Sequence, residues 1–260
     1  MTITLTTDFG YADPFVGILK GVILGIHAEA QIVDLTHGIA AQNILEGALA
    51  LWSSVHYFPD GTIHVVVVDP GVGGDRRPIL LQIDSNYFIG PDNGVLSLAL
   101  EDRQPTRIVH LTNDAYHLQP KSMTFHGRDV FAPVAAHLSR GTSPERFGDS
   151  INELVRLPWP TPNRKEKVIS GEILYIDGFG NLFTNVRGRD LTGFAKKEIV
   201  VRLGSMEVRG LSLNYSEGQS GNFIALINSW GLLEIALYRN NAATLSGTSI
   251  GDRVEIVLPG

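Results

Sequence analysis

The sequence predicts two domains, a three-layer α/β domain followed by a small antiparallel β-sheet or barrel. Three observations lead to this prediction. Strand-like and helix-like segments alternate through the first half, a proline-rich segment follows, and only short β-like runs lie beyond it. We place the α/β domain at residues 1–157, a linker at 158–167 and the β domain at 168–260.

The first half justifies the α/β class element by element. Ile3–Phe9 is rich in β-forming residues and predicts a strand. Asp13 and Pro14 then match a helix start, as an N-cap and a proline at the first helical position. Gln42–Tyr57 has apolar residues at helical spacing. Ile63–Asp69 is the strongest strand prediction, because four consecutive valines predict burial on both faces, as in a parallel sheet. Further strands are expected at Ile32–Leu35, Ile79–Ile83, Tyr87–Ile89 and Arg107–Leu111, and a third helix at Gly127–Leu138.

The second half has a different texture. Pro158, Pro160 and Pro162 stand within five positions and predict a stiff linker. Short β-like runs follow, separated by Gly, Asn and Asp, which is typical of an antiparallel sheet or barrel. The expected strands are Ile173–Ile176, Leu182–Val186, Ile199–Leu203, Phe223–Ile227, Leu233–Leu237 and Val254–Val257. All eight histidines precede the linker, so any imidazole chemistry is expected in the first domain.

Composition excludes several classes of function. The formal net charge of −6 argues against a general binder of nucleic acids or anionic membranes. The chain has no cysteine, which excludes disulfides, thiolate nucleophiles, iron–sulfur clusters and cysteine zinc sites, and suits a reducing compartment. No apolar stretch approaches the ~20 residues that span a bilayer. The N-terminal segment MTITLTTDFGY does not resemble a signal peptide, so we expect a cytoplasmic protein without a membrane partner.

The segment from Asp69 to Arg76 directly follows the strand with four valines. Ligands of open α/β sheets bind at the carboxyl ends of strands, where an Asp can face the crevice and glycines allow close approach to the backbone. A capped turn with surface charges fits the same residues. A phosphate-binding loop does not, because Arg76 stands where the last glycine of GxGxxG would be.

Other motifs are ambiguous when read singly. His126 precedes a helix-like stretch, and such a histidine is either structural or catalytic. Asp177–Asn181 and Asn228–Gly231 read as two hairpin turns or as a polar rim facing a ligand. Asp8-Phe9-Gly10 and the segment 126–129 look like kinase fragments, but their order is reversed and no glycine-rich loop precedes them. HExxH, EF-hand and GxSxG motifs are absent, which argues against a compact metal site and against an α/β serine hydrolase.

Seven short motifs in one order are far more specific than any one of them. They are Thr7–Gly10, Asp34–His37, Val68–Gly73, Gly90–Gly94, Thr124–Asp129, Asp177–Asn181 and Ser229–Glu234. In this combination the chain resembles the S-adenosyl-L-methionine (SAM) hydroxide adenosyltransferases, or SAM hydrolases, which are related to the SAM-dependent fluorinase and chlorinase. The resemblance covers nearly the whole chain.

The resemblance implies an N-terminal Rossmann-like domain, a C-terminal β-barrel and a homotrimer. Each active site of that trimer would lie between the N-terminal domain of one subunit and the C-terminal domain of its neighbour. The implied reaction converts SAM and water to adenosine and L-methionine, so SAM is the substrate, and neither cofactor nor metal is expected. Two alternatives are a SAM-dependent halogenase and a SAM- or adenosine-binding protein without turnover.

The resemblance also implies site residues. A triad of Asp, Arg and His that marks the water site of the hydrolases matches Asp69, Arg76 and His126. Halogenases carry Tyr and Thr where this chain has Asp69 and Val72, and they carry an extra loop that is missing here. Trp230 stands where the fluorinase has Arg. The implied substrate contacts are Asp8 for the ribose, Asp177 and Ser229 for the methionine end, Phe179, Asn181 and Tyr215 for the adenine, and in addition Asp13 and Ala242.

These residue types suit the implied chemistry. The sulfonium leaves as a neutral thioether, so the enzyme must mainly place a water behind C5′, in line with sulfur. Asp69 can accept a hydrogen bond from that water, and His126 can take or relay a proton. Because a neighbouring guanidinium makes a carboxylate a weaker base, Asp69 is expected to orient the water, and the proton acceptor stays open.

Overall fold

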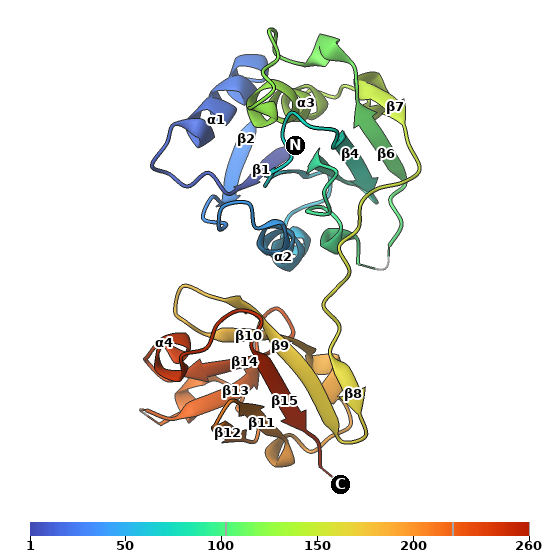
Figure 1. Cartoon of the computed structure of the whole chain (residues 1–260). Coiled ribbons are helices and arrows are strands. Elements are labelled where there is room, and N and C mark those ends of the chain that lie inside the picture. Colours follow the sequence, from blue (N-terminus) through green and yellow to red (C-terminus); the bar gives the residue numbers. More distant parts are fainter. Residues whose placement is uncertain (102, 220, 260) are drawn as a thin grey trace. The chain divides into compact units, whose positions relative to one another are not determined.

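The structure, a computed structural model, describes residues 1–101, 103–219 and 221–259 (Figure 1). Contacts divide the chain into Met1–Leu157, called unit 1, and Pro158–Gly260, called unit 2. The last residue of the predicted β domain, 260, lies outside the described residues. Within the described ranges, no helix is long and apolar enough to cross a membrane.

Unit 1 is built on a mixed seven-stranded sheet with the order β2-β1-β3-β5-β4-β6-β7. The first four strands in this order are parallel, and β4, β6 and β7 follow, each antiparallel to the strand before it in the order. Strand β3 is fully buried between β1 and β5, which confirms the prediction made from its valines. The bounds are β1 Thr2–Thr7, β2 Gln31–Thr36, β3 Ile63–Val67, β4 Pro78–Ile83, β5 Asn86–Pro91, β6 Arg107–Leu111 and β7 Gly148–Ser150.

Helices cover both faces of this sheet. Helices α1 (Phe15–Ile26) and α3 (Ala132–Ser139) pack with one face, and α2 (Ile44–Ser54) packs on the other (Figure 1). The prediction of Asp13 as the N-cap of α1 is wrong. Pro14 occupies that position, and no side chain caps the helix, because the first helical hydrogen bond joins Ile18 N–H to the Pro14 carbonyl. The expected third helix begins with a π-helical turn, Gly127–Phe131, ahead of α3.

Unit 2 is an antiparallel sheet with the order β12-β11-β15-β9-β10-β14-β13. Its end strands β12 and β13 contact each other, and a bridge joins Ser212 to Leu226, so the sheet nearly closes into a barrel around an apolar core. The bounds are β9 Val168–Ile176, β10 Leu182–Arg187, β11 Val200–Leu203, β12 Met206–Arg209, β13 Phe223–Ile227, β14 Leu232–Leu237 and β15 Arg253–Val257, with a short helix α4 at Ala242–Ser246.

One strand lies inside the expected linker 158–167. Strand β8, Asn163–Lys165, pairs antiparallel with the start of β9 through a tight turn in which Glu166 has a φ of 48°. Pairing becomes possible there because Pro162 is the last proline before β9, and the backbone N–H groups beyond it are free to join a ladder.

Candidate active site

The order of strands in the sheet reverses at β1, because β2 is added on one side of it and β3 on the other. The first set of site residues lies at this switch point. β1 lies between β2 and β3, and the helices that follow β1 and β2 cover opposite faces of the sheet. Such a switch point opens a crevice at the carboxyl ends of the strands. Asp8 directly follows β1 and Asp69 lies two residues beyond β3, so both stand at this edge.

Arg76 joins Asp69 and His126 in one hydrogen-bonded set. Its Nε donates to Asp69 Oδ1 at 2.9 Å, and its Nη2 donates both to Asp69 Oδ2 and to His126 Nδ1, the latter at 2.9 Å. All three side chains are largely buried, and the guanidinium lies 5.6 Å from the ring centroid of Phe131. The structure therefore brings together the three residues predicted for the water site.

This geometry decides which proton His126 carries. A guanidinium only donates hydrogen bonds, so Nδ1 must accept, and the ring proton lies on Nε2. Burial, and then the positive charge of Arg76, lower the pKa of His126, which favours the neutral ring. His126 Nε2 and Arg76 Nη1 are both buried, and neither has a hydrogen-bond partner among the described residues. His126 is therefore a hydrogen-bond donor at Nε2, and its other nitrogen is unavailable as a base.

Two glycines let the segments of this set pack closely. Gly73 has a φ of 75°, and a Cβ there would lie 2.1 Å from the Met123 carbonyl oxygen, so the turn after β3 is pressed against the segment that leads to His126. A Cβ on Gly127 would lie 3.4 Å from Val67 Cγ1, at the end of β3. Glycine at both positions therefore allows the two segments to approach closely enough for Arg76 to hydrogen-bond His126 near the end of β3.

Three aromatic rings stand beside this edge. Phe9, Phe15 and Phe125 pack edge to face, with centroid separations of 5.3 to 5.8 Å. They come from the residues after β1, the start of α1 and the residue before His126. Sequence reasoning missed this cluster because Phe125 is far along the chain from Phe9 and Phe15. The cluster gives the site a partly apolar wall.

The two aspartates predicted before α1 differ in their surroundings. Asp8 Oδ2 accepts a hydrogen bond from Gln42 N at 2.8 Å, and Gln42 adopts a φ of 66° to reach it. The Asp8 carboxylate keeps acceptor capacity for a ligand. Asp13 is exposed on the loop that leads to α1.

Other motif residues hold the sheet edge. His37 Nδ1 pairs with Thr7 Oγ1 at 2.8 Å, which ties the end of β2 to the end of β1. Asn93 Nδ2 donates to the Val68 carbonyl at 2.9 Å and steadies the end of β3. The motifs around His37 and Asn93 therefore hold the ends of β1, β2 and β3, which carry the site residues, in place.

A second arginine–aspartate pair lies next to the first in the sequence, and in it the aspartate is buried and the arginine is partly exposed. Arg77 Nε and Nη2 both donate to Asp92 Oδ2, and Nη2 also donates to the Glu153 carbonyl. Asp92 Oδ1 accepts from the Val155 N–H at 2.7 Å. The pair Arg77–Asp92 anchors the segment 153–155 and makes no contact with His126, so it provides a natural control for the pair Arg76–Asp69.

Unit 2 contains a pocket of about 660 Å³ at one end of its sheet. The loops β9–β10 and β13–β14, which were read either as hairpin turns or as a ligand rim, form hairpins that also line this pocket. Its lining includes five of the predicted contacts, Asp177, Phe179, Asn181, Tyr215 and Ser229. Asn228, which belongs to the predicted polar rim, also lines the pocket. Sequence reasoning gave no individual role to other lining residues, among them Phe183, Glu234, Tyr238 and Arg239.

The predicted contacts in unit 2 are not equivalent. Phe179 is 80% exposed at the tip of its loop, so its ring is available to a ligand. Asp177 Oδ1 accepts hydrogen bonds from the N–H groups of Phe179 and Asn181, and Oδ2 accepts from Asn181 Nδ2, so much of this carboxylate shapes its own loop. Ala242 is fully buried in the core of unit 2, so only its backbone is left to contact a ligand. Trp230 stacks on Tyr175 at 5.3 Å between ring centroids.

Glu234, which is buried, and Tyr215, which is 46% exposed, form a polar wall of this pocket. The Tyr215 hydroxyl donates to Glu234 Oε1 at 2.9 Å. Burial, the hydrogen bond to Glu234 and the carboxylate charges raise the pKa of Tyr215. Burial also raises the pKa of Glu234, with a further contribution from the charge of Asp177.

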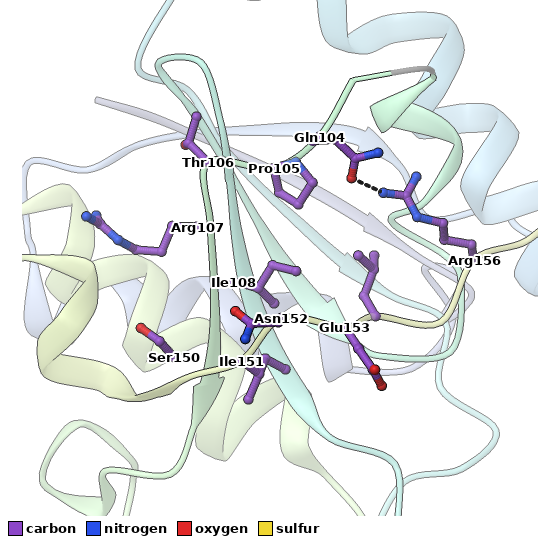
Figure 2. Close-up of a pocket in the computed structure, with 11 residues that line it drawn as sticks. Gln104, Pro105, Thr106, Arg107, Ile108, Ser150, Ile151, Asn152, Glu153 and Arg156 are labelled. Carbon is purple, nitrogen blue, oxygen red and sulfur yellow. Dashed lines mark hydrogen bonds between the residues drawn. The ribbon is translucent and has the colours of Figure 1, made fainter.

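A second pocket lies in unit 1 and contains none of the predicted residues. It measures about 580 Å³ and is lined by residues of β6 and of the segments around it (Figure 2). The apolar side chains of Ile108 and Ile151 lie among polar ones, and Arg156 donates to Gln104 at 3.0 Å. Across the described residues no group of three or more His, Asp or Glu side chains is placed to hold a metal ion.

Comparison with known proteins agrees with this arrangement. Residues 3–148 match the SAM hydroxide adenosyltransferase N-terminal domain and residues 171–255 match the C-terminal domain. A protein named (R)-S-adenosyl-L-methionine hydrolase from Methanocaldococcus jannaschii is 36% identical, covering 98% of this chain and 95% of that protein. One of the same name from Thermus thermophilus is 34% identical, covering 96% and 97%.

More distant and structural relatives complete the comparison. A fluorinase from Actinoplanes sp. is 28% identical, covering 94% of this chain and 92% of that protein. The crystal structure of an uncharacterized conserved protein from Thermotoga maritima has a TM-score of 0.92 at 33% identity, covering 98% of this chain and 100% of that chain. The chain belongs to the SAM hydroxide adenosyltransferase family.

Proposed function

We propose that this protein hydrolyses SAM to adenosine and L-methionine, by in-line attack of a water molecule at C5′ of the ribose. Relatives named SAM hydrolase that align over nearly the whole chain support this activity. The observation that carries the proposal is the single hydrogen-bonded set of Asp69, Arg76 and His126 at the switch point of the sheet.

In the proposed mechanism each member of the set has a distinct task. Asp69 accepts a hydrogen bond from the attacking water. His126 donates from Nε2 to the same oxygen, and Arg76 holds both partners in place. Positioning of this kind can contribute roughly 7–11 kcal/mol when ideal. The substrate sulfur leaves as a neutral thioether, so no oxyanion has to be stabilised.

The proton of the water goes to Asp69. Attack of a neutral water at C5′ gives a protonated alcohol, which is a much stronger acid than a carboxylic acid. A carboxylate held by an arginine can therefore accept this proton after the C–O bond has begun to form. The balanced reaction is SAM cation plus water giving adenosine, zwitterionic methionine and one proton, which Asp69 passes to solvent.

We further propose that unit 1 is a Rossmann-like domain whose residues position the attacking water. The pocket of unit 2 would bind the nucleoside. In a homotrimer, the unit 1 set of one subunit would face the unit 2 pocket of its neighbour. This proposal is supported by the family resemblance and by the division of the candidate residues between two units. Activity restored by mixing Asp69→Asn chains with Ser229→Ala chains would support it, and no rescue in verified mixed trimers would contradict it.

The reaction as proposed needs neither metal nor cofactor, since its leaving group requires no Lewis acid. Incubation of the pure protein with SAM after exhaustive chelation should yield adenosine and methionine by chromatography. S-adenosylhomocysteine as the main product, or no turnover at all, would contradict the proposal. Added chloride should give no 5′-chloro-5′-deoxyadenosine, because the Asp69 carboxylate at the nucleophile position disfavours an anion.

A further inference from the structure

Glu234 is a buried carboxyl group that no part of the proposed reaction uses. It is 0% exposed on β14, paired across the sheet with Leu226 of β13 and Phe183 of β10, and it lines the pocket of unit 2. One oxygen, Oε1, accepts the Tyr215 hydrogen bond. The other, Oε2, is buried and has no hydrogen bond of ordinary geometry to any described residue, although the Asn228 amide lies close enough to the carboxyl group to lower its pKa. A buried, unsatisfied carboxyl oxygen in a pocket wall points to a ligand group.

The charges around the pocket indicate which group this is. The charged side chains among its described lining residues are Asp177, Glu234 and Arg239. Arg239 is exposed and lies over the ring of Tyr238, with 5.1 Å between guanidinium and centroid. Within the described chain Glu234 forms no ion pair, so the lining carries one more negative than positive group when both carboxyls are ionised. A ligand with a positive charge would balance it.

A carboxylate at such a position is costly without a cation. Removing a charge from water disfavours its ionised form, so a protonated Glu234 is favoured in the free protein. The direction of its pKa, raised by burial, agrees with this. The neutral amino group of adenine would not offset the charge, whereas an ammonium would do so through a charge-assisted hydrogen bond.

We propose that Glu234 is the counter-ion of the α-ammonium group of the substrate, and that it releases a proton to solvent when the substrate binds. This inference rests on the proposed function, because it takes SAM as the ligand. Tyr215 holds Oε1 and leaves Oε2 for the ammonium. The step is a simple exchange, in which the carboxylic acid and the ammonium ligand give a carboxylate–ammonium pair and one free proton.

The sign of the pH dependence follows directly. Affinity is highest where Glu234 is already ionised in the free protein, and it falls as the pH drops through the raised pKa of Glu234. An upper limit comes from the ligand, whose α-ammonium group loses its charge at alkaline pH. The groups facing Glu234 are Asp177, Tyr215 and the Asn228 amide, with Arg239 and Tyr238 on the rim.

Calorimetry with two unreactive probes tests the proposal without turnover. S-adenosylhomocysteine carries the α-ammonium but no sulfonium, and 5′-deoxy-5′-methylthioadenosine carries the nucleoside and thioether alone. Glu234→Gln should weaken binding of the first probe about tenfold or more and leave the second within about twofold. Wild-type affinity for the first probe should also rise between pH 5 and pH 7. Glu234→Gln should lose that rise, whereas Glu207→Gln, which removes an exposed carboxylate of β12 outside the pocket lining, should keep it.

Three results would overturn the proposal. Glu234→Gln could weaken both probes equally, which assigns Glu234 a structural role through Tyr215. Glu234→Gln could leave the affinity for both probes unchanged. The wild-type protein could bind 5′-deoxy-5′-methylthioadenosine and fail to bind S-adenosylhomocysteine. Unfolding of the variant is checked by its melting temperature, and Tyr215→Phe, which keeps the charge of Glu234, should preserve the preference for the ammonium probe. Because neither probe is hydrolysed, a missing SAM hydrolase activity would be recognised separately.

Discussion

Replacing Arg76 by lysine should abolish most turnover while keeping the positive charge. The Arg76 guanidinium reaches both oxygens of Asp69 and the Nδ1 of His126. A lysine ammonium is a single point donor and cannot span the same three acceptors. At least one charge-assisted hydrogen bond of about 1.5–3 kcal/mol is lost, which corresponds to roughly 10- to 100-fold in turnover if that bond positions the water.

Arg77→Lys is the matched control for this variant. Arg77 also pairs with a buried aspartate, Asp92, and also uses Nε and Nη2. Both variants should therefore lower the free energy of unfolding by about 1–3 kcal/mol in urea titrations. Only Arg76→Lys should lower kcat, measured as adenosine formed per folded protein, with KM for SAM nearly unchanged. Normal kcat in Arg76→Lys, or an equal loss in Arg77→Lys, would refute the positioning argument.

Three further predictions follow from single features. Gly73→Ala should lower turnover about tenfold or more, because its Cβ would clash with the neighbouring loop and displace the turn that carries Arg76. Phe179→Ala should weaken adenosine binding about 2- to 10-fold in calorimetry without lowering the melting temperature, because its ring is exposed and free to stack. Burial lowers the pKa of His64 to about 4, so unfolding by urea should become easier by up to roughly 3 kcal/mol as the pH falls from 6.5 to 4.

Each of these predictions has a control. Gly61 has a positive φ similar to that of Gly73, but a Cβ there would have no atom within 4 Å, so Gly61→Ala should leave turnover unchanged. Leu213→Ala removes an equally exposed apolar side chain outside the lining of the pocket and should not affect adenosine binding. In the pH experiment the folded state binds fewer protons than the unfolded state below pH 6.5, so stability must fall with acid. His64→Gln, which cannot titrate, should reduce that loss.

Local patterns were sufficient to predict most of the fold. The four valines of β3 indicated a strand buried on both faces, and the structure has it between two parallel neighbours. Strands β7, β8 and β12 were missed because each has only three or four residues. β8 is exposed at every position, and β12 alternates over too short a stretch to stand out. The predicted start of α1 was one residue too early. Asp13 is a residue type that often caps helices, but the N-cap position is occupied by Pro14 and no side-chain cap is formed by the described residues.

The candidate site was harder to predict from spacing. Asp69 and Arg76 are neighbours in one loop, but nothing local connects them to His126, and only the family resemblance suggested this set. Glu234 was missed for a different reason. It lies in the strand Leu232–Leu237, which is buried at every position, and a carboxylate in such a run carries no signal of its pocket until the partner Tyr215 is known.

The central claim, that water attacks C5′ of SAM, is tested most directly by running the reaction in heavy-oxygen water and locating the label by mass spectrometry. The proposed mechanism predicts one labelled oxygen in the 5′-hydroxyl of adenosine and none in methionine. The Asp69→Asn variant should give the same labelling pattern at a much lower rate, because it impairs placement of the water without changing the bond that forms. Unlabelled adenosine, or label in methionine, would contradict attack at C5′.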